Sequence, residues 1–135
     1  MINKKIINLA LFTKNVGLKN KFTHKSFAKN SLCGDKIKTE FIVKKSIIKS
    51  MRYETESCIL CEASASLFSR KIKNFEIHYV KDEIEKFKKF KNKRNYKFPK
   101  KLNEFNTLIN EESSNRLTCV ILPMEAFLKA FKMLL

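Results

Sequence analysis

The sequence predicts an α+β fold, in which a small antiparallel sheet is followed by late helices and preceded by an extended basic N-terminal arm. The length of 135 residues suits one domain, and a hydrophobic content of 44% with 12 Phe is enough to build a core. Strand-like segments come first in the chain, and helical stripes follow them. We therefore expect residues 1–35 to form the arm, extended or partly helical, and residues 36–135 to form a single small domain.

Four segments have the composition of β-strands. The strands are expected over residues 38–43, 51–62, 72–80 and 117–122. In the third of these, Phe75, Ile77 and Tyr79 alternate with polar residues, which indicates a half-buried strand. The fourth is a short apolar run and is expected to be a central strand.

Three helices are expected between and after these strands. Residues 81–92 begin with acidic residues and end with lysines, an order that suits the helix dipole. A second apolar stripe at helical spacing covers residues 102–109. Pro123 is expected to open the third helix, because proline is tolerated in the first helical turn.

The charge of the chain is large and unevenly distributed. Lys and Arg number 29 against 13 Asp and Glu, a formal net charge of +16. Residues 1–50 carry +10 and residues 81–101 carry +7, whereas the rest is nearly neutral. The abundance of lysine is typical of an AT-rich genome, but such a bias alone would spread lysine evenly. The two basic blocks therefore predict contact with a polyanion, through phosphates rather than base edges.

The N-terminal segment allows several interpretations. Residues 1–12 are amphipathic and could form a short helix, which is one feature of a mitochondrial transit peptide. A basic arm that orders along nucleic acid fits better, because arginine is absent from it and lysines recur through residues 1–34. A solubilising tail is the third interpretation.

The residues expected to contact nucleic acid come from both basic blocks. The phosphate-binding candidates are Lys4, Lys5, Lys14, Lys19, Lys21, Lys25, Lys29, Lys88, Lys89, Lys91, Lys93, Arg94, Lys97, Lys100 and Lys101. Phe22, Phe27 and Tyr96 are the candidates for stacking on bases, because they interleave with the lysines. A solvated charged surface, with these aromatic rings in the core, is the alternative.

Four cysteines raise the question of a metal site. Cys58 and Cys61 form a C-x-x-C, and zinc would need two further ligands, for which Cys33 and Cys119 are the first candidates. His24 and His78 are the only histidines. The alternatives are cysteines buried in the core and, less favoured, thiol redox chemistry. Reduced thiols indicate a reducing compartment.

Enzyme signatures are absent from the sequence. It contains no P-loop, no G-x-G-x-x-G and no spaced nucleophile–base pair, and we expect no catalysis and no small-molecule substrate. No apolar run is long enough to span a membrane.

We therefore expect a ribosome-associated protein that binds ribosomal RNA and ribosomal proteins in the cytoplasm, and that silences translation from a tRNA or mRNA site. The alternatives are a constitutive ribosomal protein, cytosolic or mitochondrial, and an accessory protein of a membrane surface or mitochondrial complex.

Overall fold

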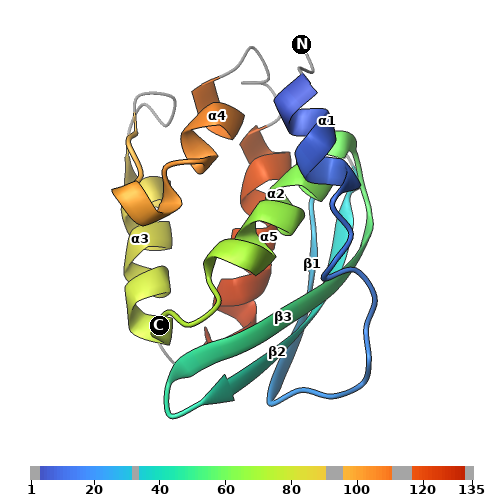
Figure 1. Ribbon diagram of the computed structural model, residues 1–135, viewed down its shortest axis with the longest axis vertical. Helices are drawn as coiled ribbons and strands as arrows, with labels where there is room; N and C mark the ends of the chain where they lie inside the picture. Colours follow the sequence, from blue (N-terminus) through green and yellow to red (C-terminus); the bar gives the residue numbers. More distant parts are fainter. Residues whose placement is uncertain (1–3, 32–33, 91–95, 111–116, 133–135) are drawn as a thin grey trace.

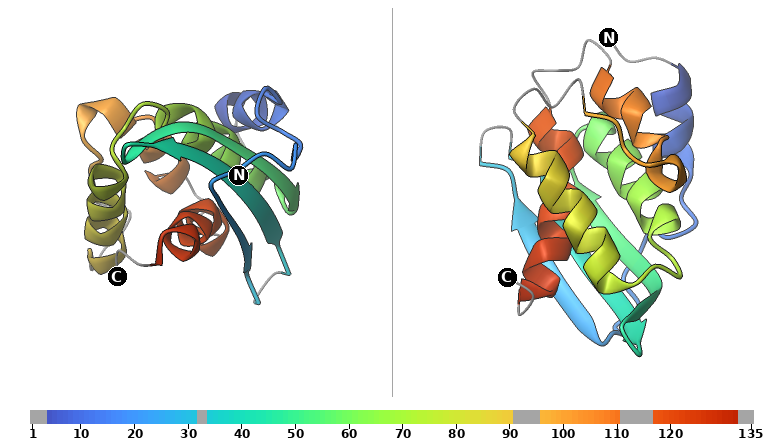
Figure 2. Two further views of the ribbon diagram at one scale, coloured as in Figure 1. Left: turned by 90° about the horizontal axis from the view of Figure 1, so that it is seen from below. Right: turned by 90° about the vertical axis from the view of Figure 1, so that its left-hand side faces the viewer.

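The structure is a computed structural model that describes residues 4–31, 34–90, 96–110 and 117–132. It has three antiparallel strands in the order β1-β2-β3, with the helices against one face of the sheet (Figures 1 and 2). This arrangement confirms the predicted α+β class with its small antiparallel sheet and late helices.

Strands and helices alternate little along the chain. The elements are α1 (Lys4–Leu11), β1 (His24–Lys29), β2 (Lys36–Lys44), β3 (Ile47–Glu56), α2 (Ile59–Lys71), α3 (Ile77–Lys89), the 3-10 turn η2 (Lys100–Leu102), α4 (Phe105–Asn110) and α5 (Leu117–Ala130).

The sheet has one buried and one exposed face. β1 pairs with β2 and β2 with β3, both antiparallel, with a bulge at Ile42 and Val43. Odd-numbered residues of β2, such as Ile37 and Phe41, face the helices and are buried, whereas Lys38 faces out. This period of two is the pattern that predicted the strand over 38–43.

The turn between β2 and β3 has two residues in the left-handed region. Lys45 has φ of 53° and Ser46 has φ of 65°. Positive φ at both central positions is the geometry of the tight hairpin turn whose twist matches that of the strands. The turn therefore sets the register of β2 against β3 although it contains no glycine.

The predicted arm contains parts of the folded domain. Helix α1 packs against α2 and buries Ile6, and β1 is a full strand of the sheet. Pairing between β1 and β2 crosses the boundary predicted at residue 35. The loop between α1 and β1 is held against the exposed face, since the backbone N–H groups of Lys19 and Asn20 donate to the Glu40 carboxylate.

Helix α2 is buried on nearly all sides. It lies between β3, α1 and α5, and its residues from Ala63 to Ser69 are buried. The prediction of a strand over 51–62 is therefore right only up to Glu56, where β3 ends. A helix with no solvent-facing side shows no amphipathic period, so its sequence pattern resembles a buried strand.

Two other predicted strands are wrong. Residues 77–80 begin α3, whose buried residues Ile77, Val80, Ile84 and Phe87 follow the helical spacing. Residues 117–122 form the first turns of α5, so Pro123 lies inside this helix and does not open it. In both cases tertiary burial overrides β propensity.

The helices confirm other expectations from the sequence. Residues 81–89 are helical within α3, residues 105–110 form α4, and residues 4–11 of the predicted N-terminal helix form α1. None of the helices in the described ranges is long and apolar enough to cross a membrane.

A cluster of phenylalanines joins the sheet to α2 and α5. The ring of Phe127 lies 5.6 Å from that of Phe41, 5.8 Å from that of Phe68 and 4.8 Å from that of Phe131, measured between centroids. Phe127 is fully buried. Edge-to-face and tilted contacts of this kind add to the free energy of burying each ring.

We expect Phe127→Ala to lower the free energy of unfolding by about 3–5 kcal/mol, because it leaves a cavity among three other rings. The measurement is urea denaturation followed by circular dichroism. Phe27→Ala is the matched control, since Phe27 is 45% exposed on the outer face of the sheet. An equal loss in the two variants would contradict the assignment of the core.

We expect the stability of the protein to fall at high pH in part through Tyr53. Burial, followed by the nearby Glu62 charge, raises the pKa of Tyr53 from 10.0 to about 12. The neutral phenol therefore contributes fully below pH 10, and this contribution, on the order of 2 kcal/mol, is lost as the pH rises from 10 towards 12. Urea denaturation at pH 8 and pH 11 should show a smaller pH dependence for Tyr53→Phe than for the wild type. An unchanged pH dependence would contradict this role.

Candidate metal centre

One group of potential metal ligands lies at the end of the domain where α2 and α5 begin. Asp35, Cys58 and Cys119 place one ligand atom each so that all three atoms lie within 4.8 Å of one another. Asp35 directly precedes β2, Cys58 is the N-cap of α2, and Cys119 lies in the first turn of α5. Residues far apart in the sequence are thus brought together by the fold.

The backbone around Asp35 is fixed by hydrogen bonds. The N–H of Asn30 donates to the carbonyl of Asp35 at 2.8 Å, and the N–H of Gly34 donates to the carbonyl of Asn30 at 2.7 Å. Gly34 has φ of +77°, a conformation that side chains other than glycine rarely adopt. The glycine therefore allows the chain to turn immediately before the acidic ligand.

Two further hydrogen bonds connect this turn to the helices. The side-chain amide of Asn30 donates to the hydroxyl of Thr118 at 2.8 Å, next to Cys119 in the sequence. The N–H of Cys58 donates to Oδ1 of Asp35 at 3.2 Å. These two contacts set the position of the Asp35 carboxylate relative to both thiols.

The Asp35 carboxylate indicates that a cation fits the group. Asp35 is 5% exposed, and its second oxygen, Oδ2, is buried without a hydrogen-bond partner among the described residues. A buried charged oxygen without a partner is costly, and a metal ion would supply the missing interaction. Two thiols and one carboxylate are a donor set that suits zinc or iron.

The predicted metal ligands are only partly brought together. Cys58 and Cys119 belong to the group, whereas Cys61 does not, and Cys33 lies outside the described residues. Burial raises the pKa of Cys61 to about 12, so its thiolate is only a minor form at neutral pH. Asp35 was not predicted as a ligand, because a single aspartate in a loop matches no metal-binding motif. Its position two residues after Cys33, itself a predicted ligand, could have identified it.

Neither histidine lies in the group. The ring of His24 packs on Phe131 with 4.5 Å between centroids, and His78 is exposed on α3. Both are therefore separate from the ligand group formed by the described residues.

The residues expected to bind nucleic acid come from several elements, and Lys29 and Lys88, one from each basic block, line the same depression. Helices α1 and α3, which carry the outer parts of the two basic blocks, lie on opposite sides of the molecule (Figures 1 and 2). Lys88 forms an ion pair with Glu125. Of the other predicted phosphate contacts, Lys91, Lys93 and Arg94 lie outside the described residues.

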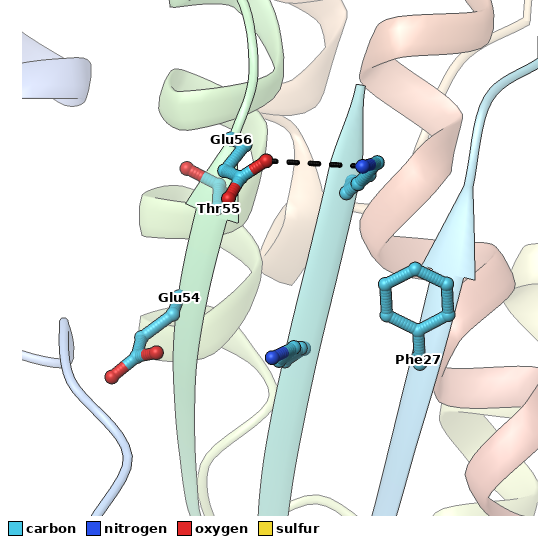
Figure 3. Close-up of a pocket in the computed structure, with 6 residues that line it drawn as sticks. Phe27, Glu54, Thr55 and Glu56 are labelled. Atoms are coloured by element: carbon cyan, nitrogen blue, oxygen red, sulfur yellow. Dashed lines mark ion pairs between the residues drawn. The ribbon is translucent and has the colours of Figure 1, made fainter. Parts of the chain in front are cut away.

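The outer face of the sheet carries both signs of charge. A shallow depression there is lined by Phe27, Lys36, Lys38, Glu54 and Glu56, with Lys36 paired to Glu56 at 4.0 Å (Figure 3). The exposed ring of Phe27 therefore shares this depression with carboxylates as well as lysines. Phe22, the second predicted stacking residue, has Lys25 Nζ 5.1 Å from its ring centroid.

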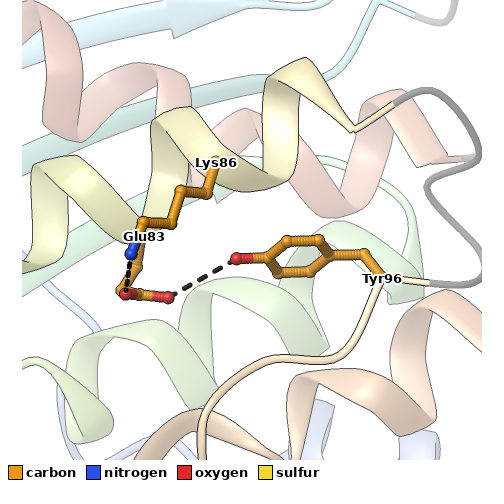
Figure 4. A network of polar contacts seen from close by, with 3 residues as sticks. All are labelled: Glu83, Lys86 and Tyr96. Carbon is orange, nitrogen blue, oxygen red and sulfur yellow. Dashed lines mark hydrogen bonds and ion pairs between the residues drawn. The ribbon is translucent and has the colours of Figure 1, made fainter.

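Tyr96 belongs to the core. Its ring packs against Phe87 and Phe98 at 5.4 and 5.0 Å between centroids, and its hydroxyl donates to Glu83, which also pairs with Lys86 (Figure 4). Burial, with the Glu83 charge second, raises the pKa of Tyr96. The alternative interpretation, in which the aromatic residues among the lysines serve the core, describes Tyr96 correctly.

Comparison with known proteins places the chain in a family. The family model described as NifU-like N terminal domain matches residues 1–111. No curated protein matches the sequence.

Solved structures share the fold. The NifU-like protein (N-terminal) of Brucella abortus has a TM-score of 0.80 at 16% identity, covering 96% of this chain and 91% of its own. The protein titled putative iron-sulfur cluster assembly scaffold protein for SUF system, from Fervidobacterium islandicum AW-1, has a TM-score of 0.77 at 18% identity, covering 96% and 95%. A hypothetical protein has a TM-score of 0.80 at 18% identity, covering 95% and 94%.

The prediction of a ribosome-associated protein with ribosomal RNA and ribosomal proteins as partners is wrong, together with its constitutive and membrane-surface alternatives. The family match overturns it. The cysteines were a more specific indication of the binding chemistry than the net charge was. The chain belongs to the family of NifU-like N terminal domains.

Proposed function

We propose that the chain is a non-catalytic scaffold that holds an iron–sulfur cluster as temporary cargo. The observation that carries this proposal is the convergence of Asp35, Cys58 and Cys119 at one end of the domain, with a buried carboxylate oxygen that has no partner in the part of the chain that the structure describes. Membership of the NifU-like family supports it. The Fervidobacterium protein of the same fold is titled as a putative scaffold for such clusters.

The position of the site suits loading and unloading. Cys58 is half-buried whereas Cys119 is buried, so one ligand is accessible from solvent and the other anchors the cargo in the domain. Iron–sulfur clusters need iron and sulfide, so a scaffold needs a protein that supplies sulfur and a protein that receives the cluster. We propose these two classes of protein as the partners.

Cys33 is proposed as a further ligand. It lies outside the described residues, but the covalent chain keeps it within two residues of Asp35. Iron–sulfur clusters are usually held by four protein ligands, and Cys33 would complete the set. Zinc is the simpler occupant of the same donors, because it accepts cysteine and aspartate in tetrahedral sites.

We expect the wild-type chain to form a cluster when it is mixed with ferrous iron and sulfide without oxygen. Cys58→Ser and Cys119→Ser should each lower the affinity for the cluster by about tenfold or more, since a thiolate ligand is lost. Visible absorption and iron content are the measurements. Cys61→Ser is the matched control, because Cys61 lies outside the ligand group, and it should retain the cluster.

Two results would sink the proposal. One is full cluster formation by both Cys58→Ser and Cys119→Ser. The other is a loss in Cys61→Ser as large as in those variants while its circular dichroism spectrum stays native.

We expect Asp35→Cys to slow the transfer of the cluster to an apoprotein by about tenfold, because iron in clusters prefers soft thiolate ligands to carboxylate. The measurement is the rate of transfer to an apo-ferredoxin. Asp82→Cys is the matched control, since it adds a cysteine on the exposed surface of α3. Transfer from Asp35→Cys at the wild-type rate would show that the carboxylate does not set the lability of the cargo.

A further inference from the structure

The C-x-x-C pair contains one cysteine that the metal group leaves unused. Cys58 is a member of the group, whereas Cys61, three residues later, is not. We propose that Cys58 and Cys61 form a redox-active dithiol, which closes to a disulfide under oxidising conditions and withdraws Cys58 from the site. The withdrawal of Cys58 from the metal site, which is the second part of this inference, rests on the proposed function.

The start of α2 holds the two cysteines one helical turn apart. Cys58 is the N-cap, with φ of −75° and ψ of 167°, and Ile59 begins the helix. The N–H of Glu62 donates to the carbonyl of Cys58 at 3.1 Å, which closes the first turn. Side chains three residues apart on a helix have Cβ atoms about 5–6 Å apart.

A disulfide needs only a small local change from this arrangement. Its Cβ atoms lie about 3.5–4.5 Å apart and its Cα atoms about 4.4–6.8 Å apart. Because Cys58 has extended rather than helical dihedrals, it can rotate towards Cys61 without breaking the hydrogen bonds inside α2. The adjustment is therefore confined to the cap.

Exposure assigns different roles to the two thiols. Cys58 is half-buried, and Cys61 is completely buried. A small oxidant therefore meets Cys58 first, and Cys61 can act only on a sulfur already attached to its neighbour. When only the first cysteine is accessible to the oxidant, the buried second cysteine reacts with it, and the product is an intramolecular disulfide.

Cys119 is the competing partner for Cys58, because their sulfur atoms lie within 4.8 Å of each other. Cys119 belongs to α5, whose first turn is held by the bond from Asn30 to Thr118 and by the bond from the Ser64 hydroxyl to the carbonyl of Val120 at 2.6 Å. Closing a bond to Cys119 pulls on this packed helix, whereas closing a bond to Cys61 moves the cap alone. The geometry therefore favours Cys61.

The oxidant is a small disulfide such as oxidised glutathione. The thiolate of Cys58 attacks one of its sulfur atoms, the glutathione S–S bond breaks, and one glutathione leaves as a thiolate that takes up the proton lost by Cys58. Cys61 then loses its proton and attacks the sulfur of Cys58, and the second glutathione leaves and is protonated. Two protein thiols are oxidised and one small disulfide is reduced to two thiols.

The disulfide would weaken metal binding because it reduces the number of ligands at the site. With Cys58 in a disulfide, the group of described ligands falls to Asp35 and Cys119. Loss of the thiolate lowers metal affinity, and returning reductant restores it. The pair would thus stop the scaffold from accepting cargo when small disulfides accumulate.

The test uses the full metal-free chain with Cys33→Ser, which removes the cysteine outside the described residues. The protein is incubated in a glutathione buffer with the oxidised form in excess, free thiols are blocked, and the disulfides are mapped by mass spectrometry. We expect a bond between Cys58 and Cys61 and no bound glutathione. Cys61→Ala and Cys61→Ser, checked for folding by circular dichroism, should show no intramolecular bond.

The effect on the site is measured by Co²⁺ titration in the same buffer. We expect the affinity to fall by about tenfold or more in the Cys33→Ser protein and to recover with dithiothreitol, while Cys61→Ala keeps its affinity.

Each remaining outcome is decisive. A bond between Cys58 and Cys119, or an intramolecular bond in Cys61→Ala, would overturn the dithiol. A mapped bond between Cys58 and Cys61 in a protein whose reduced form fails to bind Co²⁺ would confirm the dithiol and overturn its effect on the site. A Cys33→Ser protein that forms no disulfide between Cys58 and Cys61 in this buffer and still binds Co²⁺ would overturn this inference and leave the proposed function standing.

Discussion

The close approach of α2 and α5 is the constraint on which the rest of the structure depends. Small residues at positions 63–66 of α2 allow the two helices to pack, and the Ser64 hydroxyl donates to the backbone of α5 at Val120. Because both helices begin at the same end of the domain, this packing brings the N-cap of one near the first turn of the other. The separation of the Cys58 and Cys119 thiols follows from a core contact rather than from local sequence.

The third ligand, Asp35, directly precedes strand β2 and is positioned by hydrogen bonds. Asn30 closes the turn before Asp35 with its backbone and reaches α5 with its side chain. A few polar contacts thus hold a carboxylate beside two thiols in a region otherwise made of apolar packing. A buried carboxylate with one oxygen unpartnered among the described residues is unfavourable by itself, and a bound metal ion would relieve it. For the proposed scaffold, the combination of soft thiols and a hard carboxylate suits a cargo that must later leave.

The large positive charge has a modest structural role. Several lysines pair with carboxylates of the same surface, as Lys81 does with Glu85 and Lys88 with Glu125. The loop before β1 is held by the carboxylate of Glu40, which accepts its backbone N–H groups. Charge counted along the sequence predicted contact with a polyanion, but α1 and α3, which carry parts of the two basic blocks, lie on opposite sides of the molecule.

The sequence by itself determined the α+β class, the strand around residues 38–43 and the helical stripes of α3 and α4, because each depends on a local period. It also identified Cys58 and Cys119 as candidate metal ligands from the chemistry of their side chains. Only the tertiary structure decided that α2 is a helix, since burial on nearly all sides removes the amphipathic period by which a helix is predicted. It also decided that residues 117–122 begin α5. It also decided that Asp35 joins the two thiols, that Cys61 stays apart, and that Tyr96 lies in the core. The contacts that join Asp35 to Cys58 and Cys119 connect residues more than 20 positions apart, and such contacts leave no local pattern in a single sequence.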